Sequence, residues 1–137
     1  MTDSTWTNGG GDGLASTAAN WSAGIDVGYN LIFDATSVAN CTFDYSGELG
    51  TFTIAAGYSG TITQSSDMYI TGYSQAAGTF TGVISKTVTD SGSFVKTAGT
   101  LSNHVTNIIF TGTGTLTTDG NLHSVWIKPG SVITMGG

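Results

Sequence analysis

Two histidines are the side chains of this sequence best suited to act as a general base near neutral pH. His104 and His123 lie in a chain rich in Ser and Thr, whose hydroxyls are the nucleophiles that a histidine base activates. No Gly-x-Ser-x-Gly motif accompanies them, although that motif marks one large class of serine hydrolases. Further Cys or His residues at the spacing of a zinc site are also missing. We therefore interpret both histidines as structural and expect neither a metal nor a cofactor.

The nine carboxylates raise the alternative of a polysaccharide-cleaving enzyme. A glycoside hydrolase needs two or three carboxylates in one cleft, and here only Asp67 and Asp90 are spaced so that they could become neighbours. Such a pair is more often solvated in turns. A lyase acting on acidic sugars needs basic side chains, and the chain has three Lys and no Arg. The sequence therefore predicts a protein that is not an enzyme.

The charge balance excludes several classes of partner. Charged residues are 9% of the 137 residues, the net charge is −6, and the three lysines are scattered. Phosphate backbones and anionic membrane surfaces are bound by clustered Lys and Arg, so we expect no nucleic acid and no membrane. Residues 1–6 lack the basic and apolar regions of a signal peptide, so we expect either a protein that acts without Sec export or an excised or processed piece. The single Cys41 excludes an internal disulfide, and we predict that it is a small buried core residue.

A repeat organises the rest of the chain. The turn glycines Gly57, Gly78, Gly99 and Gly120 are each 21 residues apart, and a fixed period of this size is typical of a solenoid. We expect these glycines to form sharp corners at positive φ, which glycine adopts without a Cβ clash.

The repeat divides residues 31–135 into five coils of 21 residues. We expect them to begin at a mostly apolar column, made by Leu31, Phe52, Tyr73, Phe94 and Thr115. A second apolar column contains Cys41, Ile62 and Val83, and three apolar patches per coil predict three short strands separated by turns. The predicted fold class is all-β, a single-stranded right-handed β-helix (a β-solenoid) over residues 31–137. A β-sandwich, which also has many short strands and Gly-rich turns, is the alternative.

Residues 1–30 do not fit the period and are predicted to form an N-terminal cap. The first coil of a solenoid leaves an open core and a strand edge that must be covered. Trp6 and Trp21 are the expected lid, with an exposed ligand-binding aromatic pair as the alternative. The segment Gly9–Gly13 contains a Gly-rich unit similar to one calcium-binding repeat, but the unit occurs once, so we do not expect calcium.

The sequence resembles a known group of modules. The residues that carry the resemblance are Trp6, Gly11-Asp12-Gly13 and Asn20-Trp21-Ser22, then the strand Leu31-Ile32-Phe33-Asp34 and the repeated phrases at 73–81 and 94–101. They are similar to passenger-type (autotransporter-like) right-handed β-helix modules of microbial surface and viral structural proteins. The resemblance implies a scaffold, and it carries over no catalytic residue.

Three functions remain open at this point. The first is a virion component (capsid decoration, fibre or spike subunit) that works by self-association into a trimer or larger assembly, or by binding other virion proteins. The second is a module of an extracellular or cell-surface adhesin or fibre. The third is a carbohydrate-binding module that uses exposed Tyr58, Tyr69 or Trp126. We favour the first, because a short stack with few surface charges suits permanent interfaces, and we therefore expect localisation in a virion.

Overall fold

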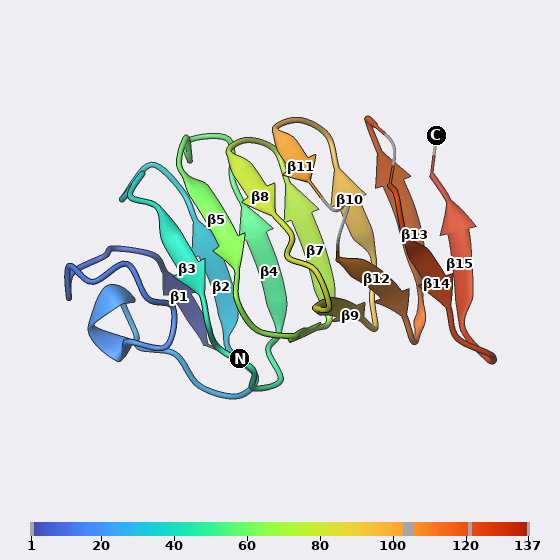
Figure 1. The fold of residues 1–137 in the computed structure, drawn as a ribbon, viewed down its shortest axis with the longest axis horizontal. Helices are drawn as coiled ribbons and strands as arrows, with labels where there is room; N and C mark the ends of the chain where they lie inside the picture. Colours follow the sequence, from blue (N-terminus) through green and yellow to red (C-terminus); the bar gives the residue numbers. More distant parts are fainter. Residues whose placement is uncertain (1, 103–105, 121, 137) are drawn as a thin grey trace.

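The computed structural model describes residues 2–102, 106–120 and 122–136, and it confirms the β-solenoid. The chain winds through about five turns of about 21 residues, and its strands form three sheets in which every pairing is parallel (Figure 1). Parallel strands need a long crossover connection, and here the remainder of each coil provides it. The helix within the described residues is η1, a short 3₁₀ helix at Ala18–Asn20.

Each of the three coils between Thr51 and Phe110 contributes one strand to each sheet. The first sheet has seven strands, in the order β1 (Asp3–Thr5), β2 (Asn30–Phe33), β4 (Thr51–Ile54), β7 (Gly72–Gln75), β10 (Phe94–Lys96), β13 (Thr113–Thr118) and β15 (Val132–Met135). The second sheet has four, in the order β3 (Cys41–Phe43), β5 (Thr61–Gln64), β8 (Thr79–Thr81) and β11 (Thr100–Ser102). The third sheet also has four, in the order β6 (Met68–Ile70), β9 (Thr87–Asp90), β12 (Asn107–Phe110) and β14 (Val125–Ile127).

Alternation along the short strands builds the core. Successive side chains of a strand point to opposite faces, so every second residue points inward and stacks on its equivalent in the next coil. In the first sheet, Leu31, Phe52, Tyr73 and Phe94 are in register and buried. The rings of Tyr73 and Phe94 are stacked, with centroids 4.3 Å apart and an interplanar angle of 8°. The core is therefore a continuous apolar column along the solenoid axis.

The register corrects two predicted columns. Leu116, not Thr115, lies opposite Phe94, so the coil that begins at Phe94 carries one additional residue. A slip of one residue exchanges the two faces of a strand, and this one turns Leu116 into the core, where it is 6% exposed. In the second sheet, Ile62 pairs with Phe80 and not with the expected Val83.

The predicted turn glycines also require a correction. Gly78 and Gly99 have positive φ, 62° and 80°, whereas Gly57 and Gly120 do not. At Gly57 the reason for glycine is space, because a Cβ there would lie 2.7 Å from the Cβ of Ala35 in the previous coil. At Gly120 a Cβ would meet no atom within 4 Å.

The N-terminal segment closes one end of the core. β1 adds a strand to the first sheet by pairing with β2, while Trp6 and Trp21 are 0% and 4% exposed. Their rings meet edge to face at 5.1 Å, and both contact Phe33 of the first coil. Each indole N–H donates to a backbone carbonyl, Trp6 to Ala39 at 3.1 Å and Trp21 to Ala15 at 2.8 Å. Both tryptophans are therefore buried against the first coil, which is incompatible with an exposed ligand-binding pair.

Candidate interaction surfaces

At the opposite end of the described solenoid, apolar residues in inward positions are exposed. Val125 and Ile127 of β14 are in register with the buried core residues Ile108 and Phe110 of β12. They occupy inward positions, yet they are 40% and 46% exposed, because no described strand follows β14 in the third sheet. Met135 of β15 shows the same pattern: it lies opposite the buried Leu116 of β13 and is 69% exposed. The apolar columns of the core are therefore uncovered at this end.

A strand edge accompanies these uncovered columns. β15 is the last described strand of the first sheet, and in Figure 1 it lies at the end of the molecule opposite β1. Its four residues, Val132-Ile133-Thr134-Met135, include no charge and no proline. Charged residues and proline usually protect native edge strands from pairing with other chains. β15 has neither, so its edge is able to pair with another chain. We call β14, β15 and the exposed Val125, Ile127, Val132 and Met135 the open end.

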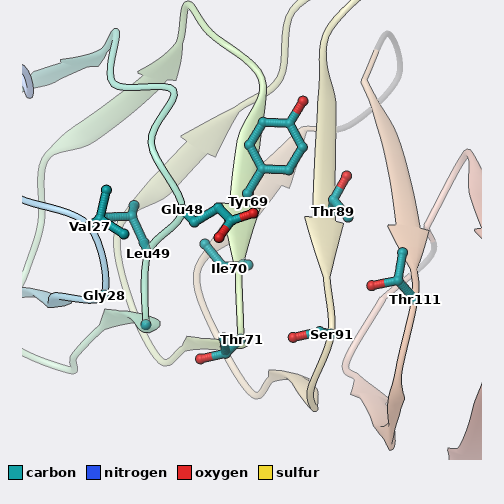
Figure 2. A pocket seen from close by; sticks show the side chains of 11 residues that line it. Val27, Gly28, Glu48, Leu49, Tyr69, Ile70, Thr71, Thr89, Ser91 and Thr111 are labelled. Carbon is teal, nitrogen blue, oxygen red and sulfur yellow. The ribbon is translucent and has the colours of Figure 1, made fainter. Parts of the chain in front are cut away.

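A second surface is a shallow groove of about 390 Å³ on the outer face of the third sheet. Figure 2 shows side chains from successive coils along it, with Glu48, Tyr69 and Thr89 in one part and Thr71, Ser91 and Thr111 in another. The buried Leu49 and Ile70 also line it. We call this feature the side groove.

The aromatic residues expected to contact a glycan are in different environments. Tyr69 and Trp126 are 39% and 58% exposed, as that expectation needs. Tyr58 is 1% exposed, so its assignment to an exposed site is wrong. Its ring packs edge to face on Phe33 with centroids 5.2 Å apart, and its hydroxyl donates to the carbonyl of Ala39 at 2.8 Å. The residue after the Gly57 corner therefore turns into the core.

The two carboxylates that were candidates for a paired site do not converge on a cleft. Asp67 accepts a hydrogen bond from the backbone N–H of Thr87 at 3.0 Å. Asp90 is fully buried and occupies an inward position in register with Ile70 and Phe110. His104 lies outside the described residues. Among the described residues, no group of three or more His, Cys, Asp or Glu side chains could hold a metal ion.

Asp90 lies buried at the end of β9 and not in the solvated turn that the sequence indicated. Its Oδ1 accepts from the N–H of Gly92 at 2.8 Å, but its Oδ2 has no hydrogen-bond partner in the described structure. Burial raises the pKa of this carboxyl to about 6, against the lowering effect of the Gly92 N–H. The alternation Val88-x-Asp90 within an inward-facing strand was a signal that could have located it.

Cys41 lies in the core, 2% exposed, in register with Ile62. Burial, together with the nearby Asp44, raises the pKa of its thiol far above the usual value. A thiol that stays protonated is a poor nucleophile, so this environment favours a packing role.

The charged carboxylate of Asp12 forms its hydrogen bonds with groups of the N-terminal segment itself. The carboxylate of Asp12 accepts hydrogen bonds from Leu14 N–H, the Thr17 hydroxyl and the Asn20 amide at 3.0, 2.7 and 2.6 Å. These bonds, led by that of Leu14, lower the pKa of Asp12. The Gly-rich segment is thus held by its own side chains.

Within the described ranges, no helix has the length and apolar character needed to cross a membrane.

Comparison with known proteins adds no family to the architecture described above. The chain matches no protein-family model, no curated protein and no solved structure. The conclusion that stands is that it is a β-solenoid of about five turns.

Proposed function

We propose that this chain is a non-enzymatic structural protein that works by assembly through its open end. The observation that carries the proposal is the exposure of Val125, Ile127 and Met135 at positions that are buried one coil earlier. Covering these residues removes apolar surface from water, which stabilises by about 25 cal/mol for each Å². β15 offers backbone hydrogen bonds at the same time, as in recognition by strand addition.

The arrangement favours a second copy of the chain as the partner at this end. Head-to-tail stacking would place the open end against the tryptophan cap, where the core is already covered by Trp6 and Trp21. Two open ends related by a two-fold axis cover each other, and such an interface closes with two copies. A trimer or a larger assembly then requires a further surface.

Among structural roles, we favour a virion component such as a capsid decoration, fibre or spike subunit. A short stack with few charged residues and one exposed apolar end suits a subunit that becomes ordered in a particle. A module of an extracellular adhesin is the second candidate, favoured by the resemblance to passenger-type β-helix modules. Neighbouring capsid genes would support the first, and a longer reading frame with further 21-residue coils would support the second.

Native molar mass by light scattering on a size-exclusion column tests the assembly. We expect the wild type to elute at a multiple of 13.9 kDa and Ile127→Asp to elute as a monomer, because a carboxylate at the interface loses its hydration. Met135→Lys should act in the same way. Ile84→Asp is the matched control, because Ile84 is 70% exposed in the connection between β8 and β9.

Two results would contradict the proposal. One is a wild-type monomer at all concentrations tested, and the other is an assembly that persists in both Ile127→Asp and Met135→Lys. Far-ultraviolet circular dichroism of each variant shows whether a change in mass reflects the interface or a loss of folding.

A further inference from the structure

The outer face of the third sheet carries a row of side chains in strict register. Tyr69 pairs with Thr89, Thr89 with Ile109, and Ile109 with Trp126, so one outward position is repeated on β6, β9, β12 and β14. Glu48 extends the row through a bridge to Tyr69. Three steps of about 4.8 Å separate the two aromatic residues, so their backbone positions lie about 14 Å apart along the solenoid axis. An exposed aromatic side chain therefore stands at each end of a row of smaller residues.

A second row runs beside it and is made of hydroxyls. Thr71, Ser91 and Thr111 line the side groove two residues further along each coil. The backbone hydrogen bonds between adjacent coils continue at these residues. Ser91 N–H donates to Ile70 O and Thr111 N–H donates to Asp90 O, both at 3.0 Å. These three hydroxyls and the carboxylate of Glu48 make no hydrogen bond within the described part of the chain. They are available to a ligand.

The size and charge of the side groove limit what it could bind. Its volume of about 390 Å³ lies within the range of about 300–1,000 Å³ for small-molecule sites. Glu48 is the charged residue that lines it, and the chain carries a net charge of −6, so an anionic polymer would be repelled. An uncharged ligand with many hydroxyls and some apolar faces fits the hydroxyl row and the aromatic rings together.

We propose that the outer face of the third sheet binds an uncharged oligosaccharide along the solenoid axis. Pyranose rings stack on Tyr69 and Trp126, because the C–H groups of a sugar face are attracted to the negative face of an aromatic ring. The sugar hydroxyls exchange hydrogen bonds with Thr71, Ser91, Thr111 and the carboxylate of Glu48. Binding to such an open surface is weak, with a dissociation constant on the order of 0.1–1 mM, because little of the ligand is desolvated.

This site uses the outward face of β14, whereas the proposed function uses the inward apolar residues of the open end. Trp126 points outward from β14, whereas its neighbours Val125 and Ile127 occupy the inward positions. A variant of the assembly interface, Ile127→Asp, should therefore retain sugar binding, and Tyr69→Ala should retain the native mass. The two proposals can fail independently.

Titration calorimetry with defined hexasaccharides tests the site. The neutral probes are β-1,4-linked glucose, mannose and xylose hexamers, and the acidic probe is a hyaluronan hexasaccharide. We expect at least one neutral probe to bind, and Tyr69→Ala and Trp126→Ala each to weaken it about tenfold. Tyr69→Phe keeps the ring and should bind within about threefold of the wild type, while the control Ile84→Ala should bind equally.

Three outcomes of the binding measurement would overturn the proposal. They are the absence of binding by all three neutral probes at about 5 mM, equal binding by wild type and Tyr69→Ala, and tighter binding of the acidic probe than of any neutral one. A change of native mass in both Tyr69→Ala and Trp126→Ala would instead identify this face as a contact between copies, and it would also overturn the glycan assignment.

Discussion

At the scale of single residues, two side chains are in environments that a pattern of residue types does not reveal. Tyr58 follows the corner at Gly57 and looks exposed in the sequence, yet it is 1% exposed because its ring fills the space beside Phe33. Asp90 looks like a turn residue, yet it occupies an inward position between Ile70 and Phe110. In both cases the neighbouring residues in the sequence allow the side chain to point inward or outward. Packing against the preceding coil sets which of the two occurs.

The buried carboxyl of Asp90 should make the stability of the protein depend on pH. Its folded-state pKa of about 6 exceeds the value of about 3.9 expected in the unfolded chain. The folded state therefore binds more protons between pH 4 and pH 6, so the free energy of unfolding should fall as the pH rises through this window. The complete penalty, present above pH 6, is on the order of 3 kcal/mol.

Chemical denaturation of wild type and Asp90→Asn between pH 4 and pH 7 measures this effect. Asn keeps an oxygen that can accept from Gly92 N–H but has no proton to lose in this range, so its free energy of unfolding should change less with pH. The variant should gain most over the wild type near pH 7. Parallel curves for the two proteins would show that Asp90 does not titrate in the folded state as its burial implies.

At the scale of elements, the glycine corners are not equivalent. Gly78 combines φ of 62° with a tight surrounding, because a Cβ there would lie 2.7 Å from Cδ1 of Tyr58. We expect Gly78→Ala to lower the free energy of unfolding by about 2–4 kcal/mol, since the strained backbone and the displaced ring both contribute. Thermal or urea unfolding measures the change.

Gly120→Ala is the matched control for the corner. Gly120 has no positive φ, and an added Cβ would meet no atom within 4 Å, so its free energy of unfolding should stay within about 0.5 kcal/mol of wild type. If both alanine variants were equally destabilised, the difference in backbone conformation between the two corners would not be the cause.

The period of the repeat was predictable, but the distribution of residues within each coil was not. Ten residues separate Phe52 from Ile62, whereas seven separate Tyr73 from Phe80, which lie in the same two columns. Each coil must return to its starting point, which fixes its total length and makes the 21-residue spacing visible. The lengths of the three arcs can compensate for one another, so the corners shift while the total stays nearly constant. The side groove depends on these corners and on pairings far apart in the chain. The sequence therefore indicated only Tyr69 in the groove and Trp126 in the same outward row.

At the scale of the whole molecule, the two ends of the solenoid differ in how well their core is covered. The first coil lies between the tryptophan cap and the second coil, whereas β14 and β15 have a described neighbour on one side. In a repeat protein, stability comes from contacts between adjacent coils, so a coil that contacts one neighbour loses about half of them. The molecule should therefore open from its C-terminal end.

Amide hydrogen exchange measured by NMR tests this asymmetry. In a monomeric sample, the hydrogen-bonded amides of Val132 and Gly136, which donate to Gly112 and Leu116, should exchange about 100-fold faster than amides of the central strand β4. Raising the protein concentration should slow exchange in β15 and leave β4 unchanged, because pairing of two open ends covers only that edge. Equal protection of β4 and β15 in a monomer would contradict end-dependent opening. Protection that rises in β4 and β15 alike would place the contact between copies elsewhere on the solenoid.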